Sequence, residues 1–137
     1  MLFPLGTLLA WAGVLPWLLF ALKLQDAYRP FYGVLGYRTF LHPLAELEGF
    51  LTCFAVGLLF TLLRSPPAAW RVLAAVVAPL ATVMLTALGL WQAGQAATVG
   101  LLIIALEFTL RRVPRSPDAL WIPFGIILGC AGAFSRL

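Results

Sequence analysis

The sequence predicts an all-α integral membrane protein with about five transmembrane helices in one bundle, the last of them short. Of its 137 residues, 63% are hydrophobic and 10% are charged, whereas soluble domains contain about 25% charged residues. The apolar residues occur in runs of about 20, the length at which a helix crosses roughly 30 Å of hydrocarbon. A soluble fold is therefore excluded, and a single helical membrane domain is expected over residues 1–137.

The first apolar run predicts a helix over residues 2–22. It ends at Lys23, whose long side chain can reach the headgroup zone. No basic segment precedes the run and no small-residue cleavage motif closes it, so a cleaved signal peptide is not expected. Residues 23–43 then mix aromatic and basic side chains, a composition typical of membrane interfaces. We expect this segment to form a loop or a short helix on the membrane surface.

The second helix is predicted over residues 44–63, directly after the chain's only histidine. Pro43 suits the first helical position, because the amide hydrogen that proline lacks would have no partner there. This placement makes His42 the residue that flanks the helix. Two prolines after Arg64 then end the helix and turn the chain.

The remaining apolar runs predict three further helices. The third covers residues 72–91, and residues 92–95 are expected to form a short uncharged connection. The fourth, residues 96–111, is short for a complete crossing and is ended by arginines and prolines. The fifth, residues 119–135, either crosses with little tilt or enters only part of the membrane.

Small residues recur at every fourth position on two of these helices. Gly49, Cys53 and Gly57 lie on the second, and Gly125 and Gly129 lie on the fifth. Membrane helices use such residues to bring their backbones close together, because the hydrophobic effect does not drive their association in lipid. The pattern predicts helix packing at these five positions.

His42 has two interpretations. A neutral imidazole near the membrane edge can act as an axial ligand to haem or another tetrapyrrole, or as a metal ligand together with Glu46. Alternatively, His42 is an interfacial residue at the start of a helix. One histidine cannot ligate both faces of a haem, so two histidine ligands would require a dimer or a partner subunit. The cofactor itself is not identified by the sequence.

Three glutamates within or beside the apolar runs have competing interpretations as well. Glu46 and Glu48 either carry protons or cations, or interact with the positive end of their helix. Glu107 lies deeper, but Arg111 follows it by four residues and can neutralise it on the same helix face. The sequence is compatible both with a role of these glutamates in carrying protons or cations and with a structural role at their helix ends.

The net charge of +4 does not indicate nucleic-acid binding, because the basic residues lie between the apolar runs rather than on one face. Membrane lipid is the expected partner. In a five-helix topology the two sides carry five and four basic residues, which does not decide the orientation; we lean towards a cytoplasmic N-terminus. The five basic residues on the side of the N-terminus are Arg64, Arg71, Arg111, Arg112 and Arg115. The four on the opposite side are Lys23, Arg29, Arg38 and Arg136.

The segment His42-Pro-Leu-Ala-Glu-Leu-Glu-Gly49-Phe50, followed by Phe54-Ala-Val-Gly57 and an arginine-proline exit at Arg64, resembles the second-helix region of the NnrS family. These are polytopic bacterial membrane proteins associated with haem, copper and nitric-oxide stress. The resemblance implies that His42 matches the family's histidine and that Glu46 or Glu48 matches its acid. The chain is much shorter than that family's proteins and lacks their further histidines.

Three functions remain in view. The first is a mainly structural subunit of a larger membrane assembly, formed with other subunits or by self-association, that can contribute a ligand to haem or another tetrapyrrole. The second is an NnrS-like haem- or metal-binding protein linked to nitric-oxide stress or respiration, and the third is a small transporter or channel component. No catalytic motif is present, so an enzyme is not expected. The expected location is a bacterial-type inner membrane, with several crossings.

Overall fold

The chain is an all-α multi-pass membrane protein. The computed structural model describes residues 1–24, 41–63, 66–112 and 120–135, and these residues contain helices and no strand. The expected surface segment, residues 23–43, lies mainly outside the described residues. The helices, in chain order, are α1 (Leu2–Ala21), α3 (Leu41–Leu44), η1 (Ala45–Leu51), α4 (Thr52–Leu62), α5 (Ala69–Ala87), α6 (Trp91–Arg112) and α7 (Trp121–Phe134).

Among the described residues, four segments are long and apolar enough to cross a membrane: Leu2–Leu19, His42–Leu62, Ala69–Ala87 and Trp91–Arg112. The second of them comprises α3, η1 and α4, which follow one another without a break. Helix α7, with 14 residues, is shorter than these four. The expectation of several long membrane helices and a short last one is confirmed.

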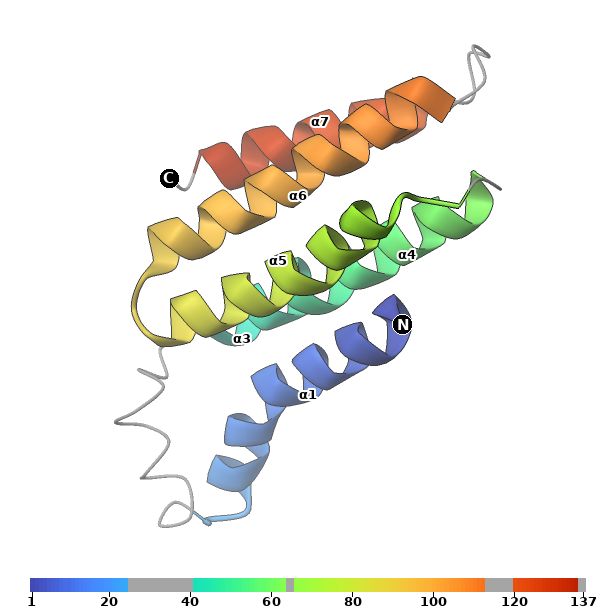
Figure 1. The fold of residues 1–137 in the computed structure, drawn as a ribbon. Coiled ribbons are helices and arrows are strands. Elements are labelled where there is room, and N and C mark those ends of the chain that lie inside the picture. The colour runs from blue at the N-terminus through green and yellow to red at the C-terminus, as the bar shows by residue number, and fades with distance from the viewer. Residues whose placement is uncertain (25–40, 64–65, 113–119, 136–137) are drawn as a thin grey trace.

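Taken with α3, η1 and α4 as one continuous helix, successive helices run in opposite directions along the bundle (Figure 1). Helix α1 packs against η1 and α4, helix α5 packs against η1, α4 and α6, and helix α7 packs on α6. Two groups of buried apolar side chains form the core, one around Phe108 and one around Cys53. The second group lies where α1, η1, α4 and α5 meet, so the predicted entrance of the second helix is a central part of the bundle.

The expected boundary between the third and fourth helices is wrong. Helix α5 ends at Ala87, and residues 92–95 belong to α6. The reason is Gly89, whose φ of +84° is accessible to glycine at little cost. Its amide donates to the Thr86 carbonyl, and the Leu90 amide donates to the Leu85 carbonyl, which is the Schellman arrangement that ends helices.

The fourth helix is consequently longer than expected. It was predicted over residues 96–111 as too short for a complete crossing, but α6 begins at Trp91 and has 22 residues. At about 1.5 Å per residue, 22 residues span about 33 Å, enough to cross the hydrocarbon layer. The correction moves Gln95 from a connection between helices into the bundle.

The start of the second helix also differs from the prediction. His42 does not flank the helix but lies within α3, which begins at Leu41. Pro43 still lies in the first turn, where no backbone donor is needed. The helix then widens into the seven-residue π-helix η1 before it continues as α4. A π-helix has more residues per turn than an α-helix. Residues four positions apart in η1 therefore do not share one helix face as they would in an α-helix.

Candidate functional site

His42 is held against the first helix. Its Nδ1 atom lies 3.2 Å from the carbonyl oxygen of Gly13, in α1. A carbonyl oxygen only accepts, so Nδ1 is the donor, and in the neutral ring the lone pair is on Nε2. The ring of Trp17 meets the imidazole edge-on, with 6.3 Å between the ring centroids. The contact with α1 therefore orients His42 and favours the tautomer that carries its proton on Nδ1.

Glu46 faces the same position of α1. A Cβ atom added to Gly13 would lie 3.5 Å from Glu46 Oε1 and 3.4 Å from the His42 carbonyl oxygen. Oε1 of Glu46 is buried and has no hydrogen-bond partner among the residues that the structure describes. The structure thus brings His42 and Glu46 to one place, the surface of α1 around Gly13.

Glu48 points to a different set of helices. It is 6% exposed and lies in η1, which packs against α1 on one side and α5 on another. Gln95 donates from Nε2 to Oε1 and Oε2 of Glu48 at 2.9 and 2.8 Å, and Thr98 donates to Oε2 at 3.0 Å. Both donors lie on α6. Burial of a carboxylate at membrane depth is costly unless hydrogen bonds compensate it, and these three provide such compensation.

Thr82 of α5 extends this arrangement. Its hydroxyl lies 2.9 Å from the hydroxyl of Thr98 and 3.0 Å from the carbonyl oxygen of Gly94, and it is fully buried. Gly94 permits the close approach, because a Cβ there would lie 2.9 Å from the Thr82 carbonyl oxygen. Glu48, Thr82, Gln95 and Thr98 are called the polar cluster below. It joins three helices inside the bundle.

The sequence interpretation placed Glu48 among the candidate acids but missed its partners. Gln95 was assigned to a connection, and Thr98 was not considered. The sequence signal for these partners is the spacing of Gly94, Gln95 and Thr98. Gln95 and Thr98 carry hydrogen-bonding side chains one helical turn apart, and the small residue Gly94 lies beside them on the same helix. If the third helix is taken to end at Gly89, the fourth helix begins earlier in the sequence and includes these residues.

The small residues of the second helix lie against α1. A Cβ on Gly49 would be 3.1 Å from Leu9 Cβ, and Gly57 lies near Leu2 and Phe3. Cys53 is fully buried, and Gly6 of α1 approaches it so closely that an added Cβ would lie 3.0 Å away. The glycines of α1 and of the second helix thus each face a larger residue of the other helix, and both helices contribute to the close contact.

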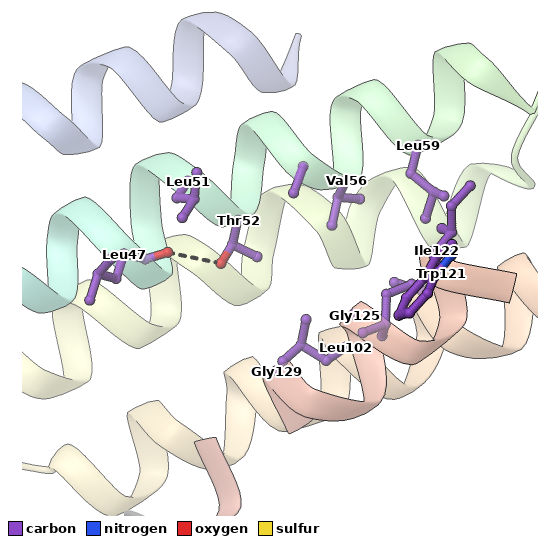
Figure 2. A pocket seen from close by; sticks show the side chains of 13 residues that line it. Leu47, Leu51, Thr52, Val56, Leu59, Leu102, Trp121, Ile122, Gly125 and Gly129 are labelled. Carbon is purple, nitrogen blue, oxygen red and sulfur yellow. Dashed lines mark hydrogen bonds between the residues drawn. The ribbon is translucent and has the colours of Figure 1, made fainter. Parts of the chain in front are cut away.

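The fifth helix does not use its glycines in the same way. Gly129 lies near Leu102 of α6, but a Cβ on Gly125 would meet nothing within 4 Å. The predicted packing role of Gly125 has no counterpart among the described residues, where α7 packs on α6 and a groove lies between Gly125 and the residues of η1 and α4. Figure 2 shows this groove of about 480 Å³, which Gly125 and Gly129 line together with mainly apolar side chains.

Glu107 forms an ion-pair cluster at the other end of α6. Oε1 lies 2.5 Å from Arg111 Nε, four residues on, and Oε2 lies 2.7 Å from Arg71 Nη2 on α5. The guanidinium of Arg71 also lies over the rings of Trp70 and Phe108. The sequence indicated the Arg111 partner and missed Arg71. A structural role at the helix ends accounts for all three charges.

The ligand chemistry of the described part of the chain is limited. No three histidine, cysteine, aspartate or glutamate side chains lie close enough there to hold a metal ion. His42 can therefore supply one ligand to a larger group, whereas a complete site would need further donors. Comparison of the chain with protein-family models, curated proteins and solved structures finds no match.

Proposed function

We propose that this chain is a small subunit of a larger assembly in a bacterial-type inner membrane, and that His42 supplies one axial ligand to a haem or related tetrapyrrole shared with a partner. The hydrogen bond from His42 Nδ1 to the Gly13 carbonyl carries the proposal. Histidines that bind metals commonly donate from the other ring nitrogen to a carbonyl or a carboxylate, which orients the lone pair.

The need for a partner follows from the donor set. The chain has one histidine, and the described residues contain no cluster of three metal-ligating side chains. One imidazole occupies one axial position of a haem, so a second histidine ligand would come from another subunit or a second copy. The residues present fit a contribution to the site, and the role proposed for the chain is binding rather than catalysis.

The second candidate is an NnrS-like protein that binds haem or a metal by itself, in nitric-oxide defence or respiration. The segment from His42 to Phe50 and its exit at Arg64 favour this candidate through their resemblance to that family. The two functions differ in what accompanies the purified chain, since only the first requires other polypeptides.

The experiment is purification of the chain from its native membrane in mild detergent, followed by absorption spectroscopy. We expect other polypeptides to co-purify and a haem-type spectrum to be present. The control is His42→Asn, because an asparagine amide can donate to the Gly13 carbonyl but offers no imidazole Nε2. The variant should assemble normally and lose or change the spectrum.

Each alternative outcome is decisive. An unchanged spectrum in His42→Asn contradicts the ligand role. A monomeric chain that retains the spectrum alone contradicts the subunit role and supports the NnrS-like candidate. Absence of any chromophore from the intact assembly contradicts haem binding in both candidates.

A further inference from the structure

We propose that the apolar groove between α7 and the second membrane helix binds one acyl chain of an anionic phospholipid, whose phosphate lies against Arg112. The groove has a volume of about 480 Å³ and is open at Gly125, where an added Cβ would meet nothing within 4 Å. Figure 2 shows Leu59 and Trp121 together at one end of the groove and Leu47 towards the other. His42 contacts α1 and does not line the groove, so this site is separate from the proposed ligand role.

The length of the groove matches one leaflet of a membrane. Leu59 follows Leu47 by 12 positions, so the groove extends over about 18 Å along the second helix. The hydrocarbon layer is roughly 30 Å thick, so each leaflet contributes roughly 15 Å of acyl chain. A partner helix that crosses the membrane would instead lie along the whole layer. The length therefore favours an acyl chain that enters from one side.

The width of the groove leads to the same choice. Its volume divided by its length gives a mean cross-section of about 27 Å². An α-helix with its side chains is about 10–12 Å in diameter, so its cross-section is roughly 80–110 Å². A single hydrocarbon chain needs only roughly 20 Å², because apolar carbon atoms pack about 4 Å apart. One acyl chain fits within the groove, whereas a helix could place only side chains in it.

The lining of the groove is suited to hydrocarbon rather than to a polar molecule. Thr52 carries its only hydroxyl, which donates to the Leu47 carbonyl oxygen at 3.1 Å (Figure 2). Apart from Thr52 and Trp121, the lining residues are aliphatic or glycine. A polar group placed there would lose its hydrogen bonds to water without replacement. The polar part of the ligand must therefore lie beyond the end of the groove.

Arg112 lies beyond the end of the groove that Leu59 and Trp121 mark. It follows the lining residue Ala105 by seven positions, which places it on the same face of α6, about two turns or roughly 10 Å farther on. Its guanidinium lies 5.1 Å from the centroid of the Phe108 ring. That ring belongs to the same buried cluster as Leu59 and Ala105, so Arg112 is connected to the groove by direct packing.

The charges near Arg112 select an anionic headgroup. Glu107 pairs with both Arg71 and Arg111, and no acid among the described residues pairs with Arg112. Three arginines and one glutamate leave an excess of two positive charges at this end of the bundle. Basic residues at the mouth of a pocket between membrane helices bind anionic headgroups, and a tryptophan is favoured at the same depth. Trp121 and Arg112 together suit the headgroup region of one leaflet.

The test is quenching of tryptophan fluorescence in the full-length chain, reconstituted in phosphatidylcholine vesicles with a small fraction of lipid that is brominated on its acyl chains. Trp121 lines the groove and reports a bromine atom within it. Brominated phosphatidylglycerol should quench at an about fivefold lower fraction than brominated phosphatidylcholine, and high salt should reduce this preference. Equal quenching by the two lipids at low salt would overturn the proposal.

Three substitutions assign the signal to the two parts of the site. Trp121→Phe should remove the quenching that is specific to phosphatidylglycerol. Arg112→Gln should reduce the preference for phosphatidylglycerol about fivefold and leave quenching by brominated phosphatidylcholine unchanged. Gly125→Leu fills the groove and should weaken the quenching of Trp121 by brominated phosphatidylglycerol at least about fivefold.

Gly132→Leu is the matched control, because Gly132 lies on the same helix, has open space for a Cβ and does not line the groove. It should leave the quenching unchanged. Specific quenching that persists in Trp121→Phe or in Gly125→Leu would place the lipid elsewhere and overturn the assignment. Absence of Trp121 quenching by either lipid would show that a second copy or a partner helix closes the groove, which also overturns it. If Gly125→Leu does not fold, Trp121→Phe and Arg112→Gln still decide between these outcomes.

Discussion

Gln95 and Glu48 lie 47 positions apart in the sequence, and the amide nitrogen of Gln95 lies within 2.9 Å of both carboxylate oxygens of Glu48. The contact joins η1 of the second membrane helix to α6 of the fourth. It forms beside Gly94, where the α5 and α6 backbones approach closely. Packing and polar contacts are thus combined in one part of the bundle.

Removal of this contact should reveal energetic coupling between the two residues. We expect a double-mutant cycle of Glu48→Met and Gln95→Met to give a coupling of about 1–2 kcal/mol, the range of hydrogen bonds between membrane helices and to charged groups. Reversible unfolding in mixed detergent micelles measures it. A coupling near zero would show that the two side chains do not bind each other in the folded protein.

Gly94→Ala should destabilise the contact between α5 and α6. The added Cβ would lie 2.8 Å from Thr86 Oγ1 and 2.9 Å from the backbone oxygen of Thr82, so the helices must move apart. We expect a loss of about 1–3 kcal/mol in the free energy of unfolding.

Gly100→Ala is the matched control for this substitution, since Gly100 lies on the same helix and its added Cβ meets nothing within 4 Å. Stability should stay the same or rise slightly, because alanine favours the helix. Equal losses in the two variants would contradict the close approach at Gly94.

Gly13→Ala should disturb the position of His42. The new Cβ would lie 2.9 Å from Ala45 Cβ, an atom fixed by the backbone, so α1 must separate from the second helix. We expect a lower Tm and, in the assembly, an altered chromophore spectrum. Gly132→Ala on α7 has open space and should change neither quantity. An unaltered Tm and spectrum in Gly13→Ala would count against the α1 contact.

Arg71 should contribute more to stability than Arg111, although both pair with Glu107. The Arg71 side chain is 12% exposed and lies over two aromatic rings, whereas that of Arg111 is 72% exposed. We expect Arg111→Met to cost at most about 0.5 kcal/mol and Arg71→Met to cost about 1–3 kcal/mol in unfolding experiments. The reverse order would contradict the observed burial.

Composition and run length were sufficient for the fold class, because a membrane requires long apolar helices whatever their details. The boundaries were harder. Gly89 falls inside the third helix predicted over residues 72–91, although its left-handed conformation ends α5 and allows α6 to start at Trp91. Local turn chemistry, rather than hydropathy, decides where these two helices meet.

The polar residues of the second helix could be found from their rarity but could not be oriented. A spacing of four suits an α-helix, but η1 is a π-helix, in which Glu46 faces α1 while Glu48 faces Gln95 and Thr98 of α6. The partners of Glu48 come from a helix about 50 positions away, and no local pattern encodes that pairing. Its identification required the packed bundle.

The most direct test of the proposed role of His42 is its tautomer. Because His42 is the chain's only histidine, NMR of protein labelled with ¹⁵N-histidine gives signals from this ring alone. The proposal predicts, for the chain free of cofactor at a pH at which the ring is neutral, a protonated Nδ1 and an unprotonated Nε2. A protonated Nε2 with a bare Nδ1 would place the lone pair against Gly13 and contradict the assignment of His42 as a ligand.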